Sequence, residues 1–498
     1  MNPAIGFGAL IAVSLSTALI GFYGLRISRT TSDFYVASRT VRPWWNASAI
    51  GGEYLSAASF LGVAGLVLLS GTDALWYPVG YTAGYLMLLL FVAAPLRRSG
   101  AYTVPDFTEA RLASRTVRRV TSALVVVVGW LYIVPQLHGA ALTISITTGL
   151  PSWIGAVAVV AVVIVTVTAG GMRSITFVQA FQYWLKLTAL AVPVIFMLLA
   201  VGGGAAAVKM NDVVNPTGAA PTGLYQTVSL LIALLFGTLG LPHVLVRFYT
   251  NPDGKSARKT TMIVLALLSV FYLLPTTVGY LARLVPGSLP AAGQADAIAL
   301  TLPSMLIPGP LGEMLSALVV AGAFAAFLST TSGLVISLAG VISQDVLGGS
   351  VKGFRVAAVC SALVPLAIAA PTQSPALAGS VGLVFAFTAS TICPVLLLGI
   401  WWRRLSDIGA VVGMIAGAVL CGGSIVASTL LGSGATPGWI AQPAAWTVPA
   451  AFAVMITISL LSPQRVPTET ARMMARLHVP ERADVSDRAL GSQRPLTD

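Results

Sequence analysis

Charged residues are scarce in this sequence. Asp, Glu, Lys and Arg together make up 9% of its 498 residues, whereas hydrophobic residues make up 56%, and the mean hydropathy is +0.88. Soluble domains carry roughly 25% charged residues, so the composition excludes an ordinary soluble protein. Helices satisfy their own backbone groups inside hydrocarbon, so long apolar runs of this kind predict an all-α polytopic membrane protein.

Cysteine is almost absent, and two other signals are missing. Cys360, Cys393 and Cys421 are the only cysteines; all lie in apolar segments and none pairs at a metal-ligand spacing, which argues against a disulfide framework and a structural metal. No phosphate-binding loop of the Walker type occurs, so ATP-driven pumping is not supported. The first basic residue, Arg26, follows the first apolar run instead of preceding it, so we interpret that run as a membrane span and not as a cleavable signal peptide.

Hydropathy predicts about thirteen spans, and the basic residues orient them. All 28 Lys and Arg residues except Lys209, Arg283 and Lys186 lie either in the tail or in the loops on one side of the membrane. The positive-inside rule therefore predicts a plasma-membrane protein with its N-terminus outside and its C-terminus in the cytoplasm. The net charge of +12 is then a property of the cytoplasmic face, which argues against nucleic acid as a partner. The expected spans are about 5–25, 46–70, 75–96, 120–148, 152–170, 177–201, 224–249, 261–285, 313–347, 354–371, 376–402, 408–431 and 445–462.

The second span is not a plain apolar helix. Gly51 and Gly52 precede Glu53, and Ser56 and Ser59 follow within about two turns. A carboxylate in a membrane segment costs on the order of 3 kcal/mol unless it finds a partner, and the glycines allow the helix to unwind and free its carbonyls. Hydroxyl and carbonyl oxygens bind small hard cations. The alternative is a tight helix–helix contact built from small residues.

A second interrupted span lies at 224–249, where Gly237, Gly240 and Pro242 break the helical pattern. Five spans over about 46–201 and five over about 224–402 then each begin with an interrupted helix. This pattern is typical of inverted-repeat secondary transporters, whose discontinuous helices hold the solute. We predict one transporter domain over 1–462, a cytoplasmic polar tail over 463–498, and one short helix near Glu469–Leu477 in that tail.

The span at 313–347 carries a run of hydroxyl residues: Ser329, Thr330, Thr331 and Ser332. Each alone is readily explained by a bond back to its own helix carbonyl. Four together, after a run of small residues, can instead supply oxygens to a cation. The remaining ligands would come from the unwound segment between Gly52 and Ser56.

With these features in view, the chain resembles the sodium/solute symporter family, and specifically its acetate and short-chain monocarboxylate permease branch. The resemblance implies the five-plus-five inverted-repeat (LeuT-like) transporter fold with additional flanking helices. It also implies a cation site formed by the carbonyls of Gly52, Leu55 and Ala326 and the hydroxyls of Ser329 and Thr330, with sodium as the metal if the chain is sodium-coupled. The matching stretches, which fall in order over roughly 350 residues, are SDFYVASRTVRPWWNASAIGGEYLSAASFLG, TAGGMRSITFVQAFQ, GTLGLPHVLVRFYT and AAFLSTTSG with the following ISQD.

One position departs from the family pattern. Many sodium-coupled members carry an aspartate where this chain has Gln179. A glutamine cannot carry the charge that assists ion passage, although the monocarboxylate branch resembles this chain here. The coupling ion is therefore expected to be sodium or a proton, and no cofactor is expected.

The substrate site is predicted from polar residues near the two interruptions and in the fourth span. Arg247 lies close to the inner loop, where we interpret it as a snorkelling or inner-gate residue, and Trp44 and Trp45 as interfacial anchors. No Lys or Arg is expected at the centre of the site, so half-helix ends would hold an anion. The candidate substrate residues are Glu53, Tyr54, Ser56, Ser59, Gln136, His138, Thr238 and His243.

These observations predict a secondary active symporter and not an enzyme. It would import a short-chain monocarboxylate of the acetate, pyruvate or propionate type with sodium or protons; its partners are that small organic anion and the lipid bilayer, with no partner protein implied. The alternative is a sodium symporter for an amino acid, sugar or vitamin. A membrane sensor of the same fold would need a signalling domain, for which a tail of roughly 36 residues leaves no room. A passive channel would need no coupled-ion site, so the two interrupted polar spans argue against a channel.

Overall fold

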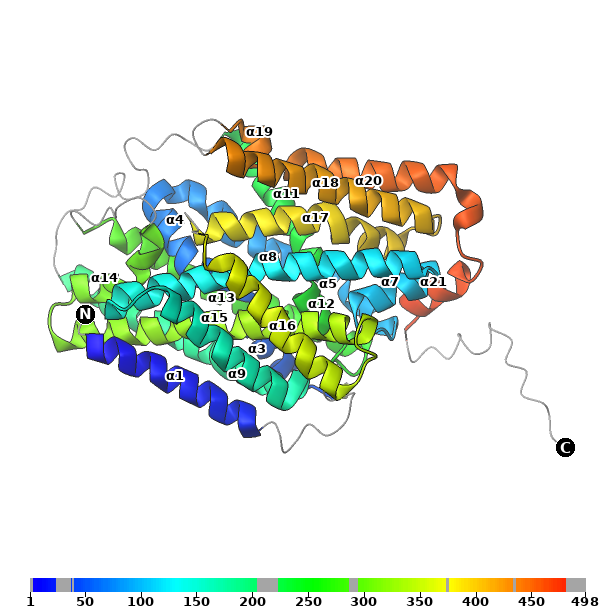
Figure 1. Cartoon of the computed structure of the whole chain (residues 1–498). Coiled ribbons are helices and arrows are strands. Elements are labelled where there is room, and N and C mark those ends of the chain that lie inside the picture. The colour runs from blue at the N-terminus through cyan, green and yellow to red at the C-terminus, as the bar shows by residue number, and fades with distance from the viewer. Residues whose placement is uncertain are drawn as a thin grey trace.

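The computed structural model describes residues 3–23, 37, 40–203, 223–285, 294–372, 376–432 and 436–480, and helices make up nearly all of this part of the chain. The long helices run side by side in one bundle (Figure 1). The N-terminal end of α1 and the short helix α14 lie at one end, and α7 and α21 lie at the other (Figure 1). The expected features that fall on 24–36, 204–222, 286–293 and 481–498, including Lys209 and the end of the tail, lie outside the described residues.

The helices follow the predicted spans closely. The first half of the bundle contains α1 (Pro3–Tyr23), α3 (Pro43–Tyr54), a π-helical turn (Ala58–Gly62), α4 (Val63–Ser70), α5 (Trp76–Phe91), α6 (Ala93–Arg98), α7 (Val104–Leu112), α8 (Arg115–Thr148) and α9 (Trp153–Gly203). The remainder contains α11 (Leu224–Gly240), α12 (Pro242–Phe248), α13 (Gly254–Ala282), α14 (Ile298–Leu306), α15 (Pro310–Asp345), α16 (Val351–Ala369), α17 (Leu377–Trp401), α18 (Asp407–Leu431), α19 (Gly438–Ala441), α20 (Ala444–Leu461) and α21 (Thr470–His478).

The expected count of thirteen spans stays a prediction. Among the described residues, ten helical stretches are long and apolar enough to cross a membrane, or eleven if the bent pair α11 and α12 is one span. Two stretches each cover two expected spans: Ala58–Phe91 and Trp153–Gly202. The second would be about 75 Å long if straight, more than twice the hydrocarbon thickness. It folds at Gly171, whose φ of 57° and ψ of −155° only glycine adopts readily.

The first predicted interruption is present. α3 ends at Tyr54, and Leu55 leaves the helical region with φ −73° and ψ 84°. Helical structure resumes as one π-helical turn at Ala58. Gly52 allows this segment to lie directly against α9, since a Cβ there would collide with the backbone carbonyl of Gln179.

The second predicted interruption is also present. α11 ends at Gly240, Leu241 adopts φ −66° and ψ 113°, and α12 starts at Pro242. The two helices meet at an angle of 46°. Proline fits the first turn of a helix because its missing N–H would have no partner there.

α15 occupies the middle of the bundle, where it packs against α9, α8, α16 and α3. Its most apolar stretch is 78% buried, which matches its small residues and its lack of an outward polar face. In the tail, α21 confirms the predicted short helix. Arg111 of α7 holds its start by donating to the Thr470 hydroxyl at 3.3 Å and to the Gly399 carbonyl at 2.8 Å.

Candidate functional site

The interruption after α3 exposes backbone groups that side chains from other helices satisfy. The Thr330 hydroxyl of α15 donates to the Glu53 carbonyl at 2.6 Å. On the other side of the break, the Ala57 N–H donates to Gln136 Oε1 of α8 at 2.9 Å. Buried backbone groups require such partners, so these contacts stabilise the unwound segment between α8 and α15.

At the same break, predicted cation ligands converge on the side-chain amine of Lys186, which lies in the second half of α9. Lys186 Nζ donates to the Leu55 carbonyl at 2.8 Å, to Ser329 Oγ at 2.6 Å and to the Gly52 carbonyl. Ser329 Oγ in turn donates to the Ala326 carbonyl at 3.0 Å. Three of the predicted oxygens, from Gly52, Leu55 and Ser329, thus meet at one side-chain nitrogen. Their assignment as ligands of a cation stays a prediction.

Sequence reasoning missed the role of Lys186 and expected no basic side chain at the centre of the site; that expectation is wrong. Lys186 is fully buried. The available signal was a single lysine inside an otherwise apolar span, because an ionisable residue at such a position is functional by default. Its partners lie more than 130 positions away in the sequence, so the local pattern could not identify them.

A second charged group lies on the neighbouring face of α3. Arg247 Nε of α12 contacts Glu53 Oε2 at 2.8 Å, and both side chains are 1% exposed. Arg247 is thus the partner that a carboxylate in a membrane segment requires. The interpretation of Arg247 as a snorkelling residue is wrong, because its guanidinium points into the bundle and also donates to Thr176 Oγ1 at 2.8 Å.

Gln179 connects this ion pair to the Lys186 site. Its Oε1 accepts a hydrogen bond from Arg247, and its Nε2 donates to the Ser329 carbonyl at 2.8 Å. The amide can do both because it carries a donor and an acceptor. An aspartate at this position would offer only acceptors and could not donate to a carbonyl.

The predicted substrate residues on α3 and α11 bridge the two interrupted helices. Tyr54 Oη lies 3.1 Å from Thr238 Oγ1 and donates to the Tyr81 carbonyl at 3.2 Å. Ser59 Oγ lies 2.9 Å from Tyr272 Oη. Ser56 is buried beside them. The structure thus brings these polar side chains together around the first break.

Next to them lies a buried aromatic cluster that contains polar atoms without partners. Tyr132 stacks on His243 at a centroid distance of 5.2 Å, and Tyr54 packs on Tyr85 at 4.6 Å and on Tyr81 at 6.1 Å. Within the described part of the chain, the hydroxyls of Tyr81 and Tyr85 and both ring nitrogens of His243 have no hydrogen-bond partner. Unsatisfied buried donors are costly and mark places where a ligand can bind.

Sequence reasoning missed Tyr81 and Tyr85, although a signal was present. Tyr77, Tyr81 and Tyr85 recur at intervals of four in the apolar helix α5. Residues four apart lie on one helix face, so this spacing predicts an aromatic stripe facing the interior.

Two other predicted features lie at the periphery. His138 contacts the Ala369 carbonyl and Thr372 Oγ1 at the end of α16, both at 3.2 Å. Gln136, two positions earlier, faces the break instead, since residues two apart point in different directions on a helix. Trp44 and Trp45 are about half exposed on the bundle surface, and their role as interfacial anchors stays a prediction.

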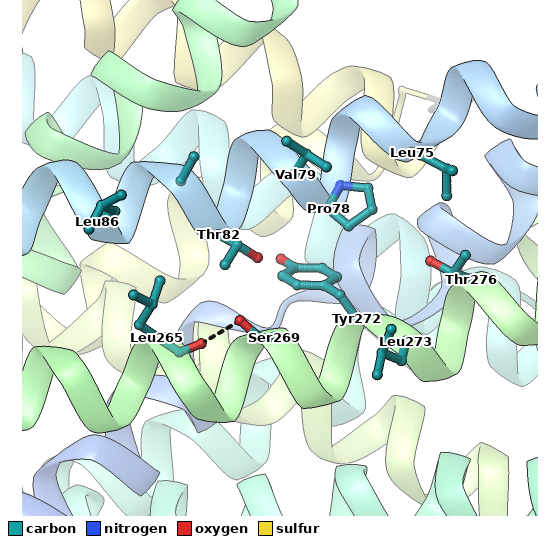
Figure 2. Close-up of a pocket in the computed structure, with 11 residues that line it drawn as sticks. Leu75, Pro78, Val79, Thr82, Leu86, Leu265, Ser269, Tyr272, Leu273 and Thr276 are labelled. Atoms are coloured by element: carbon teal, nitrogen blue, oxygen red, sulfur yellow. Dashed lines mark hydrogen bonds between the residues drawn. The ribbon is translucent and has the colours of Figure 1, made fainter.

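A lateral cleft of about 560 Å³ separates α5 from α13 (Figure 2). Figure 2 shows the Tyr272 ring pointing into it between Pro78 and Leu273. Val79 and Leu273 of its lining are 49% and 66% exposed, so the cleft opens on the outer surface of the bundle. The polar groups of Lys186, Glu53 and Arg247 do not line it, and the buried cluster is therefore the better candidate for a solute site.

Comparisons with known proteins agree with this architecture. The model of the Sodium:solute symporter family matches residues 34–417. The chain is 32% identical over 435 residues to "Uncharacterized symporter YwcA" of Bacillus subtilis (strain 168), which covers 83% of this chain and 84% of the relative. It is 30% identical over 462 residues to "Monocarboxylic acid transporter" of Corynebacterium glutamicum, which covers 84% and 82% respectively.

Two solved structures share the fold. One is a Na+-coupled sialic acid symporter in a substrate-bound, outward-open state, with a TM-score of 0.74, 16% identity and coverage of 92% of this chain and 97% of that chain. The other is Mhp1, a nucleobase-cation-symport-1 family transporter, with a TM-score of 0.58, 15% identity and coverage of 89% and 98%. At these identities they support the fold alone, which is the expected inverted-repeat transporter fold.

Proposed function

Because this chain belongs to the Sodium:solute symporter family, we propose that it imports a short-chain monocarboxylate, of the acetate, pyruvate or propionate type, across the cell membrane. Import is driven by a sodium or proton gradient, with the N-terminus outside and the tail in the cytoplasm. The oxygens of Gly52, Leu55, Ala326, Ser329 and Thr330 form its cation site.

The observation that carries this proposal is the charge balance around the break. Glu53 and Arg247 neutralise each other at 2.8 Å, which leaves the buried Lys186 as a surplus positive charge. The hydroxyls of Tyr81 and Tyr85 and the imidazole of His243 lie nearby without partners. A carboxylate only accepts hydrogen bonds, so one small anion matches both the surplus charge and these donors.

The substrate class follows from size and from the relatives. The donors lie inside a closed aromatic cluster, which suits an acid of a few carbon atoms better than a sugar. A dicarboxylate would bring a second negative charge, for which no further buried cation lies in the described cluster. One relative that this chain matches over most of its length carries the name of a monocarboxylic acid transporter.

Uptake into proteoliposomes tests the proposal. Labelled acetate should accumulate only while an ion gradient persists, since each tenfold accumulation needs about 1.4 kcal/mol. Unlabelled pyruvate and propionate should compete, and succinate, glucose and amino acids should not. Competition by a sugar or an amino acid alone would favour the alternative, a symporter for another small solute.

Matched hydroxyl deletions locate the substrate. Tyr85→Phe and Tyr81→Phe should each raise the KM for acetate about tenfold, which corresponds to the loss of one hydrogen bond to a charged group. The control is Tyr225→Phe, because Tyr225 is 39% exposed and its hydroxyl donates to the Gln442 carbonyl far from the break. Equal KM values in all three variants would place the substrate elsewhere.

A further inference from the structure

The amine of Lys186 lies at the point where oxygens predicted to bind a coupling sodium ion meet. We propose that its ammonium group permanently replaces that ion, so that transport by this chain does not depend on sodium. This inference rests on the proposed transport function and identifies which of the two candidate ions does not drive it.

The contacts match an ammonium group in number and type. Lys186 Nζ lies within hydrogen-bond distance of three oxygens, which belong to Leu55, Ser329 and Gly52. An ammonium has three N–H donors and no acceptor. All three donors are therefore used, and the two backbone carbonyls freed by the break are satisfied without any metal ion.

The hydrogen-bond partners favour the charged form of the amine. A neutral amine would have two hydrogens and a lone pair, and the lone pair would need a donor. The two carbonyls cannot donate, and the hydrogen of Ser329 Oγ is directed at the Ala326 carbonyl at 3.0 Å. An ammonium group satisfies all three of these oxygens at once with its three N–H groups.

The surroundings leave neither space nor charge for sodium as well. Lys186 is fully buried, and its Nζ lies at the point where the freed carbonyls and Ser329 Oγ meet. A sodium ion there would contact a second unit positive charge at low dielectric constant. Glu53, the acid on the same helix segment, is already paired with Arg247. The oxygen set therefore does not fit sodium in this chain.

Gln179 agrees with this assignment. Its carboxamide accepts from Arg247 and donates to the Ser329 carbonyl at 2.8 Å. Between two cationic side chains, it adds no negative charge that would attract a further cation. The neutral residue at this position is therefore consistent with a site whose cation is covalently attached.

The direct test compares sodium with potassium at equal ionic strength. Acetate uptake by the wild-type protein in proteoliposomes should change by less than about twofold when potassium replaces sodium on both sides, since a change of that size is under 0.5 kcal/mol. Thermal unfolding of the detergent-purified protein should be the same in both salts, because a ligand that does not bind the native state does not stabilise it. A saturable sodium dependence in either measurement overturns the proposal. The unfolding measurement needs no substrate, so it remains decisive if acetate is not transported.

The converse test opens the site. In Lys186→Ala the three oxygens lose their donor, and sodium can bind among them. Sodium should then stabilise this variant and increase its residual uptake about tenfold relative to potassium, whereas the exposed-lysine control Lys259→Ala should behave as wild type. A folded Lys186→Ala protein that does not distinguish the two salts overturns the assignment of this position as a cation site. If this variant does not fold, the comparison of salts on the wild-type protein still decides.

Discussion

Replacement of Glu53 by glutamine is expected to destabilise the protein strongly. Glu53 is 1% exposed and pairs with Arg247 at 2.8 Å. The exchange keeps the size of the side chain, but it leaves Arg247 and Lys186 buried without a carboxylate between α3 and α9. Removing one partner of a buried ion pair costs about 3–5 kcal/mol, because the remaining charge stays uncompensated.

The matched control is the same exchange at the surface. Glu109 contacts Arg118 at 2.5 Å, but these side chains are 32% and 25% exposed, and Arg118 also contacts Asp106 and Asp345. Glu109→Gln should therefore cost about 1 kcal/mol or less. The free energy of unfolding, measured by denaturant titration in detergent micelles with helical circular dichroism, compares the two variants.

A double-mutant cycle then isolates the pair. Arg247→Met should also cost about 3 kcal/mol or more. The double variant Glu53→Gln/Arg247→Met should lose about 2 kcal/mol less than the sum of the single losses, since residues in one ion pair are coupled. Additive losses, or equal losses for Glu53→Gln and Glu109→Gln, would refute the view that the buried pair stabilises the break.

Three further predictions test other contacts. Gly52→Ala should prevent folding, because the added Cβ would collide with the Gln179 carbonyl, whereas the control Gly202→Ala places its Cβ in open space. The yield of monodisperse protein in detergent compares the two variants. Equal yields would argue against close packing of α3 on α9. Tyr54→Phe should lower the free energy of unfolding by about 1 kcal/mol, because it removes the hydrogen bond to Thr238. A denaturant titration measures this change. An unchanged stability would show that this hydrogen bond contributes nothing. Arg111→Met should cost about 1–3 kcal/mol by leaving buried carbonyls without a donor and should speed proteolysis before α21. The exposed Arg119→Met should do neither, and similar cleavage rates for both would contradict a role for Arg111 in holding the tail.

The helices and their interruptions were predictable because their causes are local. Each span is a continuous apolar run, and each break lies at glycine or proline: Gly51 and Gly52 before the first, Gly240 and Pro242 at the second. Such residues act on the backbone within one turn. The boundary expected between 170 and 177 has a local cause too, because Gly171 adopts a φ of 57° that interrupts the helix there.

The oxygen-rich half of the site was also visible in the sequence. Hydroxyls in a row at 329–332 and a carboxylate beside two glycines are unusual in hydrocarbon. These patterns predicted correctly that the break in α3 and the middle of α15 meet, which the bond from Thr330 to the Glu53 carbonyl demonstrates.

The occupant of that site depended on tertiary structure alone. Lys186 lies 134 positions from Gly52 and 143 from Ser329, and nothing near it in the sequence suggests an oxygen partner. The rotation of a helix in the bundle decides where its lysine points: to a neighbouring helix, to a cavity or to the membrane surface. The close contact of α9 with α3 sets this rotation. As a result, the Lys186 amine lies among oxygens that the sequence pattern predicted to bind sodium.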